Sequence, residues 1–261
     1  TVQCWTLLKE TNMTYNLIGV GNNAKTIKGD GSEYVTAIKY MMPYKTMFQG
    51  KVHNICAMAE KAGCHVACLN TAGRGVMTSV QKGRLRKTQL FIADKLSFMQ
   101  QLNDDVHVFH RRCSKKGIQS CVRLNGTSDI QYEKLDLMHT FPDVQFYDYT
   151  KIAKRAYAEL PSNYHLTLSY SEKDEGYARQ IRKAVDDTGV NMAVVFGVKS
   201  ADDFPATFLG LPVINGDKDD LRFLDPTHCV VGLIAKGKAK KDTSGFVVHP
   251  NEDGTWGRLQ K

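Results

Sequence analysis

The sequence predicts an α/β fold built on a parallel barrel of the TIM type, full or partial, with an amino-terminal cap. From Ile118 onward, short apolar or alternating runs give way to polar residues and then to helical stretches. This order is typical of parallel strands joined by crossover helices. The chain contains no Gly-x-Gly-x-x-Gly turn and no Gly-x-x-x-x-Gly-Lys-Ser/Thr loop, so an open nucleotide-binding sheet lacks its usual signature. The length of 261 residues also suits one α/β barrel.

Strands and helices are expected to alternate in the second half of the chain. Cys121–Asn125 alternates with period two, which is typical of a strand. Ser128 and Gln131 have capping-box spacing, which predicts a helix that ends near Thr140. Asn191–Val198 is nearly all apolar, as strands covered on both faces are. We expect parallel neighbours around one core at residues 121–125, 144–150, 165–171, 191–197 and 230–235.

The remaining residues are expected to complete and surround this barrel. Apolar spacing predicts one or two amphipathic helices within 89–116. Further elements are expected as a strand at 212–215 and helices at about 151–160 and 173–187. The expected organisation is strands that cap the barrel at 1–50, the barrel-like domain at 51–240 and a tail at 241–261. We also expect Met13 to be the natural start, which would remove Cys4 and Trp5 from consideration.

Composition and charge exclude several classes of protein. Hydrophobic residues make up 42% and charged residues 24%, unlike a disordered chain. No stretch reaches the roughly 18 consecutive apolar residues of a membrane span, so we expect a cytoplasmic protein without membrane contact. Seven cysteines and no secretory signal argue against a disulfide framework. The net charge of +8 is compatible with a nucleic acid or phosphate-bearing partner and equally with a merely basic surface.

The strand ends are the expected location of a site, because parallel α/β folds bind ligands where the carboxyl ends of their strands converge. Alternation places Arg123 and Asn125 on one face, which would direct them into a barrel mouth. Helix capping is the alternative role for Ser128, Asp129 and Ser171. We expect catalytic roles for Lys151 and Tyr149, and cofactor or substrate contacts from Asn125, Ser169 and Asp129.

Three cysteines lie close together in the sequence. Cys56, Cys64 and Cys68 have Cys-x7-Cys-x3-Cys spacing and are followed by a glycine-containing stretch to Gly75. In a helix, Cys64 and Cys68 would share one face, and a preceding loop could bring Cys56 to the same point. Three thiolates suit an iron–sulfur cluster with one open iron, or zinc completed by His65 or water. The alternative is three small buried residues in an alanine-rich helix.

The runs Arg123–Asp129, Phe141–Lys151 and Leu168–Ser169 resemble the strand motifs of the phage gene-product-88-like family. The resemblance covers roughly Cys56–Ser171 and includes clustered cysteines in the amino-terminal part. A more distant resemblance is to radical S-adenosylmethionine enzymes, whose partial barrels hold a four-iron cluster on three cysteines. Those enzymes usually show Cys-x3-Cys-x2-Cys, from which this chain departs. The family would place the protein in the cytoplasm of a host cell.

The first functional hypothesis is an iron–sulfur metalloenzyme similar to the radical S-adenosylmethionine group. The resemblance implies a 4Fe-4S cluster on Cys56, Cys64 and Cys68, with S-adenosylmethionine bound at its open iron. A phage context and a basic chain make a nucleotide or nucleic-acid-related compound the expected substrate. The oligomeric state cannot be predicted from the sequence.

Two other hypotheses do not need such a cluster. The chain could be a non-catalytic nucleic-acid-binding phage protein with buried or zinc-binding cysteines. The cations available for it form two runs, Lys82, Arg84, Arg86 and Lys87, and then Arg111, Arg112, Lys115 and Lys116. Alternatively, a metal-independent lyase would use Lys151 as a Schiff-base amine.

Overall fold

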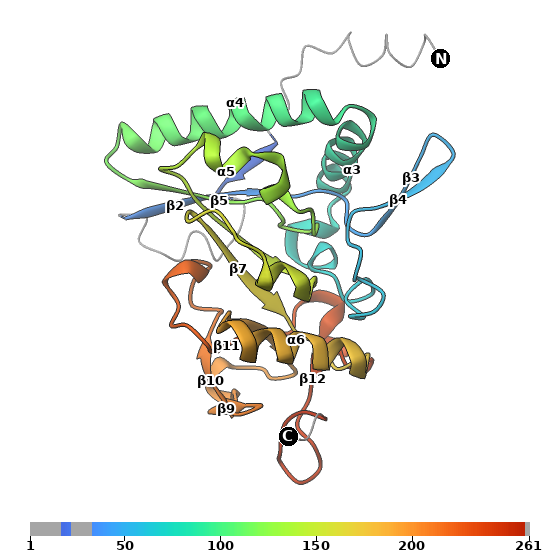
Figure 1. Ribbon diagram of the computed structural model, residues 1–261. Helices are drawn as coiled ribbons and strands as arrows, with labels where there is room; N and C mark the ends of the chain where they lie inside the picture. The colour runs from blue at the N-terminus through green and yellow to red at the C-terminus, as the bar shows by residue number, and fades with distance from the viewer. Residues whose placement is uncertain (1–16, 22–32, 259–261) are drawn as a thin grey trace.

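A computed structural model describes residues 17–21 and 33–258. The expectations for Cys4, Trp5 and Met13 lie outside these residues. The described chain forms one large mixed sheet with helices packed on it, and a separate hairpin projects from one side (Figure 1). The hairpin consists of β3 (Lys45–Phe48) and β4 (Lys51–Asn54), which pair antiparallel.

The main sheet has ten strands, and its central strands are parallel. From one edge to the other, its order is β1 (Ile18–Val20), β2 (Tyr34–Lys39), β5 (Gln119–Arg123), β6 (Gln145–Thr150), β7 (Tyr164–Ser169), β8 (Met192–Phe196), β11 (Val230–Ile234), β10 (Leu211–Asn215) and β9 (Thr207–Phe208). A tenth strand, β12 (Val247–Val248), pairs parallel with the second half of β8. The five strands expected as parallel neighbours are successive neighbours in this sheet.

The predicted TIM-like barrel, full or partial, is wrong, because the described sheet is open. Its strands β2, β5, β6, β7, β8 and β11 follow one another in a single direction, as barrel strands also do. The two edges do not meet: antiparallel β1 lies outside β2, and antiparallel β9 lies outside β10. Closure depends on strand tilt and stagger, which alternation in the sequence does not encode. Strands within 1–50 and 241–261 both pair in this main sheet.

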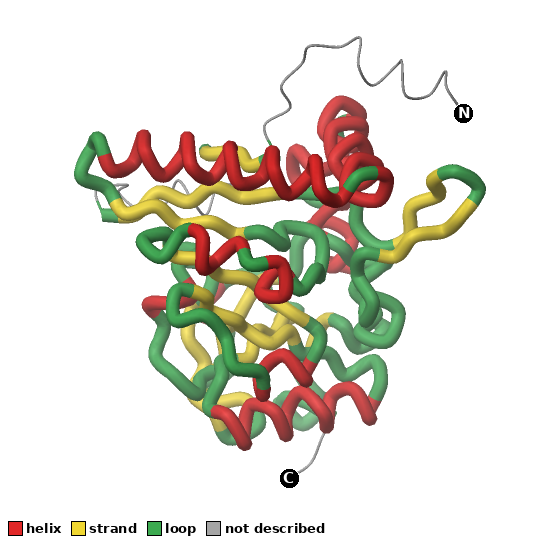
Figure 2. Tube along the Cα trace, turned by 45° about the horizontal axis from the view of Figure 1, so that its top comes forward, coloured by secondary structure: helices red, strands yellow, loops and turns green. Residues whose placement is uncertain are grey.

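Two long helices precede β5. These are α3 (Thr78–Ala93) and α4 (Lys95–Ser114), separated by Asp94, whose carboxylate caps α4 by accepting the Ser97 backbone N–H at 3.0 Å. The amphipathic spacing in α4 buries Phe98, Leu102, Val106 and Phe109 in the core. Figure 2 shows α4 lying along the sheet. The expectation of one or two amphipathic helices within 89–116 is therefore confirmed by α4, whereas α3 begins earlier and buries only Arg84 and Thr88.

The helices expected at 128–140 and 151–160 are much shorter than predicted. The first region holds a 3-10 turn at Tyr132–Leu135 and the four-residue α5 (Leu137–Thr140), separated by Asp136 with φ of +58°. Ser128 does not cap a helix, since its hydroxyl donates to the Asn125 side chain at 2.7 Å. The second region holds only a 3-10 segment, Ala153–Tyr157. The third expected helix is α6 (Glu175–Thr188), which ends at Gly189 in the left-handed conformation.

The two faces of the sheet have different characters. The buried apolar side chains of β6, β7 and β8 at alternate positions join the cores that include residues of α4 and α6. Alternation directs Arg123, Tyr147, Tyr149 and Thr167 to the opposite face. That opposite face is covered in part by the segment 219–225, whose Phe223 ring packs 5.8 Å from the Tyr147 ring. Polar residues of the strands are therefore not gathered on one side.

Lys39 is fully buried on the α4 side of the sheet. Its ammonium lies 4.5 Å from the Tyr132 ring centroid and 5.5 Å from that of Phe98. Burial lowers its pKa to about 7, although the charge of Asp148 opposes this shift. An unfolded lysine titrates near pH 10.4. Between pH 7 and about 10 the unfolded chain binds a proton at Lys39 that the folded chain does not. The free energy of unfolding therefore falls as the pH falls from about 10 to 7.

We expect Lys39→Met to be more stable than the natural chain at pH 7, with an advantage that shrinks as the pH rises toward 10. The change removes a buried charge, which can cost up to about 1.4 kcal/mol per pH unit across this window. Urea unfolding at pH 7, 8.5 and 10 measures the effect. Lys154→Met, at an exposed position, is the control. A stability difference that does not vary with pH would contradict the prediction.

Candidate cysteine and lysine site at the carboxyl edge

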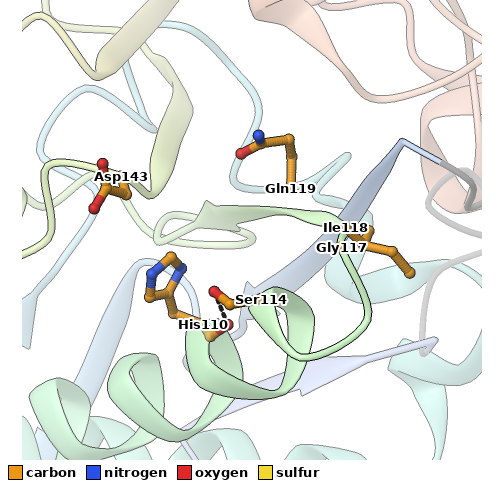
Figure 3. A pocket seen from close by; sticks show the side chains of 6 residues that line it. All are labelled: His110, Ser114, Gly117, Ile118, Gln119 and Asp143. Atoms are coloured by element: carbon orange, nitrogen blue, oxygen red, sulfur yellow. Dashed lines mark hydrogen bonds between the residues drawn. The ribbon is translucent and has the colours of Figure 1, made fainter.

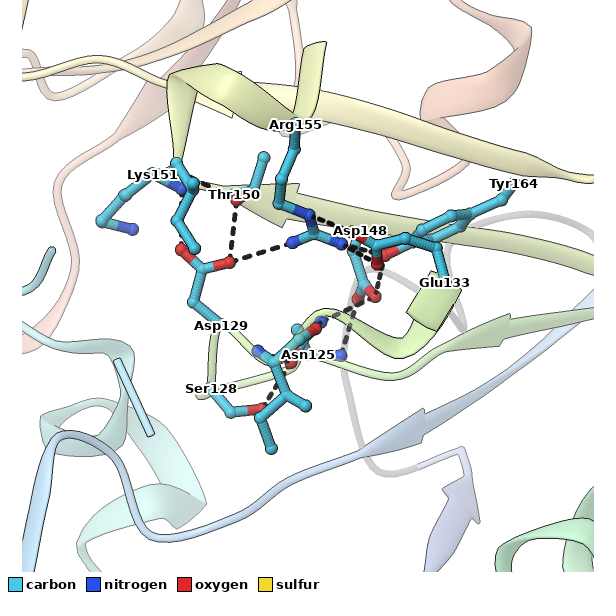
Figure 4. Close-up of polar contacts among 11 residues, drawn as sticks. Asn125, Ser128, Asp129, Glu133, Asp148, Thr150, Lys151, Arg155 and Tyr164 are labelled. Carbon is cyan, nitrogen blue, oxygen red and sulfur yellow. Dashed lines mark hydrogen bonds and ion pairs between the residues drawn. The ribbon is translucent and has the colours of Figure 1, made fainter. Parts of the chain in front are cut away.

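Asp129 joins the loops that follow β5 and β6. Its carboxylate accepts the backbone N–H of Lys151 at 2.8 Å and the Thr150 hydroxyl at 2.8 Å (Figure 4). The same carboxylate forms an ion pair with Arg155 at 3.1 Å. Because one side chain binds three groups of the next loop, the position of Lys151 is set by Asp129.

Arg155 extends this network into the interior. It is only 3% exposed, and its guanidinium donates two hydrogen bonds to Glu133 at 2.9 and 2.8 Å. It also donates to the Tyr164 hydroxyl at 2.7 Å. A buried guanidinium bound by two carboxylates is satisfied in charge and in hydrogen bonding. Sequence reasoning missed Arg155 and Glu133, and no local signal marks them, because they are 22 residues apart.

Asn125 belongs to the same network rather than to an open cavity. Its backbone N–H and side-chain amide donate to Asp148 at 2.6 and 2.9 Å. Asp148 is fully buried, which raises its pKa to about 6 against the opposing effects of the Asn125 N–H and Arg155. The Asn125 side chain also binds the backbone of Ile130 at both its oxygen and its nitrogen. Its hydrogen bonds therefore hold the loop.

Tyr149 lies in a different polar cluster, on the opposite face of the sheet. The Arg123 guanidinium lies 4.5 Å from the Tyr149 ring centroid and pairs with Asp220 at 3.0 Å. The Tyr147 hydroxyl donates to the same carboxylate at 3.0 Å. Asn125 lies beyond the last residue of β5, so strand alternation no longer sets its direction. The structure therefore does not bring Asn125 and Tyr149 together.

Ser169 ends β7, where its backbone carbonyl accepts the hydroxyl of Tyr177 from α6. The Ser171 hydroxyl, which is fully buried, donates to the Gly245 carbonyl at 3.2 Å. Both serines thus contact segments that cover the carboxyl ends of the strands. The bond recorded for Ser169 involves its backbone carbonyl and not its hydroxyl. The expected contact of Ser169 with a cofactor or substrate therefore stays a prediction.

The segment with the three cysteines lies over the carboxyl edge of the sheet. The Cys56 thiol donates to the Thr127 carbonyl in the loop after β5 at 3.5 Å. A side chain at Gly63 would collide with Lys173 in the loop after β7. Thr71 accepts the backbone N–H of Lys238, which follows β11, at 3.3 Å. One segment thus contacts loops from three strands and places its cysteines where parallel α/β folds hold ligands.

The three cysteines differ in exposure from the other described cysteines. Cys56, Cys64 and Cys68 are half-buried, whereas the remaining three are buried. Backbone N–H groups point at two of the sulfurs, from Tyr44 to Cys56 at 3.4 Å and from Asn70 to Cys68 at 3.5 Å. Hydrogen bonds of this kind are a property of sulfur ligands in metal centres. The Asn70 bond also caps the 3-10 turn Leu69–Thr71, so exposure is what distinguishes these cysteines from the other three.

Lys151 shares an electrostatic environment with all three thiols. Burial favours the neutral form of the lysine. The negative charges near it outweigh that effect and raise its pKa; they come from Cys64, Asp129, Cys56 and Cys68. Burial likewise raises the pKa of Cys56, and the Lys151 charge opposes this. The lysine is held as an ammonium ion, which is the opposite of what a Schiff-base amine needs. The site is a charged lysine among thiols.

The three thiols of Cys56, Cys64 and Cys68 are the type of ligand that iron–sulfur and zinc centres use. Thiolates are the ligands of iron–sulfur clusters and of structural zinc, and the nearby ammonium ion favours their charged form. Within residues 17–21 and 33–258, no three Cys, His, Asp or Glu side chains are arranged as metal ligands. The Cys64 thiol instead donates to the Ala59 carbonyl at 3.8 Å. Ligation would require the three side chains to turn toward one point.

The two basic runs have different environments. Arg84 is buried, lies 4.7 Å from the Tyr40 ring centroid and donates to the Asn70 side chain. Lys87 donates to the Leu17 carbonyl at 2.8 Å. Half of the first run therefore serves internal contacts. All four cations of the second run, Arg111, Arg112, Lys115 and Lys116, are exposed.

Fold and site together define an α/β protein with an open, mostly parallel sheet and a cysteine-bearing segment across its carboxyl edge. Residues 7–250 match the family described as gene product 88, and the chain belongs to this family. The expected phage gene-product family is thereby confirmed. No curated protein and no solved structure matches the chain. The distant resemblance to radical S-adenosylmethionine enzymes has no support from these comparisons, and neither has that cofactor.

The length and hydropathy of the helices bear on membrane insertion. Among the described residues, no helix has the length and hydropathy needed to cross a bilayer. The expected compartment stays a prediction.

We expect Arg155→Met to lower the free energy of unfolding by about 3–5 kcal/mol, because Asp129 and Glu133 would remain buried without their partner. Chemical denaturation at pH 7 measures the loss. Arg179→Met is the matched control, since Arg179 pairs with Glu175 on the exposed surface of α6, where such pairs contribute about 0–1 kcal/mol. Equal losses in the two variants would show that the buried network does not have this role.

Proposed function

We propose that Cys56, Cys64 and Cys68 bind a thiolate-ligated metal centre, an iron–sulfur cluster first and zinc as the alternative. The protein would then be a metal-dependent enzyme. The observation that carries the proposal is that three half-buried thiols belong to one segment that contacts the loops at the carboxyl edge, where their charges act on Lys151. Three protein ligands would leave one coordination position of such a centre open to a substrate.

The contacts of the sulfurs support thiolate chemistry. An ammonium ion and backbone N–H donors both favour the charged form of a thiol. Lys151 supplies the ammonium, while Tyr44 and Asn70 supply the N–H groups. Burial still raises the pKa of Cys56 and Cys68, so these groups offset only part of the cost of burying negative charge on the sulfurs. A bound iron–sulfur centre would supply electron transfer or Lewis-acid activation of a substrate at its open iron.

The chain's own residues would give this centre a fixed surrounding. Asp129 holds the backbone of Lys151, and Arg155 holds Asp129. A side chain at Gly75 would collide with the Asn70 carbonyl, so this glycine permits the tight turn that follows Cys68. The substrate class within this proposal is a nucleotide or nucleic-acid-related anion, supported by the net charge of +8.

We expect protein purified without oxygen to contain bound iron and sulfide, or zinc, and to lose most of it when any one of the three cysteines is replaced by serine. Two thiolates cannot retain a centre that three hold. Elemental analysis and the visible absorption spectrum measure the content. Cys113→Ser, at a buried cysteine in α4, is the matched control and should keep its metal.

Two outcomes would overturn this proposal. One is metal-free wild-type protein that also fails to take up iron with sulfide, or zinc, under anaerobic conditions. The other is equal metal loss from the Cys113 control and the three serine variants, which would point to damage to the fold. Circular dichroism of each variant separates unfolding from loss of ligands.

A further inference from the structure

A hollow of about 480 Å³ lies at the amino edge of the sheet, where β5 begins. It is opposite to the edge that carries Lys151 and the cysteines, because Gln119 starts the strand whose far end leads to Asp129. Figure 3 shows His110 of α4 and Asp143 on separate sides of this hollow. The lining residues are His110, Ser114, Gly117, Ile118, Gln119 and Asp143.

Four cations stand beside the hollow at the end of α4. Arg111 and Lys115 are four residues apart, and so are Arg112 and Lys116, so each pair shares a side of the helix end. All four side chains are exposed, and none forms an ion pair with a residue that the structure describes. The carboxylates nearby are Asp143 in the wall of the hollow and Glu33, whose carbonyl accepts the Gln119 N–H.

We infer that this end of α4 and the adjoining hollow bind the phosphate backbone of double-stranded nucleic acid. Among the residues that the structure describes, four exposed cations face the two carboxylates of Asp143 and Glu33, which gives this surface a positive charge. A duplex presents one phosphate per 3.4 Å of each strand. No Phe, Tyr or Trp of the described chain lines the hollow, so the base stacking that recognises single strands is missing. This inference does not rest on the proposed metal centre.

The helix dipole alone does not explain the four cations. Positive side chains in the last turn of a helix are favoured, but the effect falls off within that turn. Lys115 and Lys116 follow Ser114, the last helical residue. Ser114 and Gly117, which line the hollow, use their hydroxyl and N–H in bonds to the carbonyls of His110 and Ser114, both at 3.0 Å. The phosphate contacts would therefore come from the four cations.

The test is fluorescence anisotropy with a labelled DNA duplex of about 20 base pairs, titrated at several salt concentrations. We expect the triple variant Arg111→Gln, Arg112→Gln, Lys115→Gln to bind several-fold more weakly. The slope of log affinity against log salt should become shallower by about 0.9 for each phosphate that the variant no longer neutralises. Lys238→Gln, Lys240→Gln, Lys241→Gln is the control, since it removes three exposed cations at the other edge.

A control variant that weakens binding as much as the first variant would overturn the inference, because net charge alone would then explain the affinity. Absence of duplex binding by the wild-type protein at low salt would also overturn it. Tighter binding of a single strand of the same length would exclude the duplex as the partner. The metal content of the two triple variants reports separately on the cysteine site, so each proposal can fail without the other.

Discussion

The carboxyl edge of this protein depends on the pairing of buried carboxylates with buried donors. Asp129 pairs with Arg155, and Asp148 accepts the Tyr164 hydroxyl. Arg155 also donates to that hydroxyl, which joins the two carboxylates in one network. A buried carboxylate without partners costs several kcal/mol, so neither loop can leave its place without exposing one of these groups. The network therefore makes the loops after β5 and β6 one unit. The position of the Lys151 backbone is fixed by this network, because its N–H donates to Asp129.

The same constraint explains which parts of the fold could be predicted. The central strands were predictable because alternation and apolar runs are local properties of the chain. The short helices after β5 and β6 were not, because the loops there are held by pairs between distant residues, such as Asp129 with Thr150 and Arg155. Open edges could not be predicted either. They depend on short antiparallel strands such as β1 and β9, which carry little sequence signal.

The sequence indicates candidate site residues where residue type is informative, but not where long-range packing decides. The three cysteines and Lys151 stood out by spacing and by position at a strand end. Alternation gives the face on which Tyr149 lies, but its surroundings there could not be predicted, since they include Asp220 and Arg222 from a distant segment. Arg155 was missed for a similar reason, because its partners come from another loop. Long-range polar pairing leaves no periodic pattern in a sequence.

The two edges of the sheet place two different chemistries at a distance set by strand length. The strands β6 and β7 have six residues each, so at about 3.3 Å per residue the edges are roughly 20 Å apart. The half-buried thiols lie at the carboxyl edge, and the four exposed cations of the second basic run lie at the amino edge. On the two proposals, a small ligand at the cysteines and a duplex at the end of α4 would therefore bind at opposite edges of the sheet.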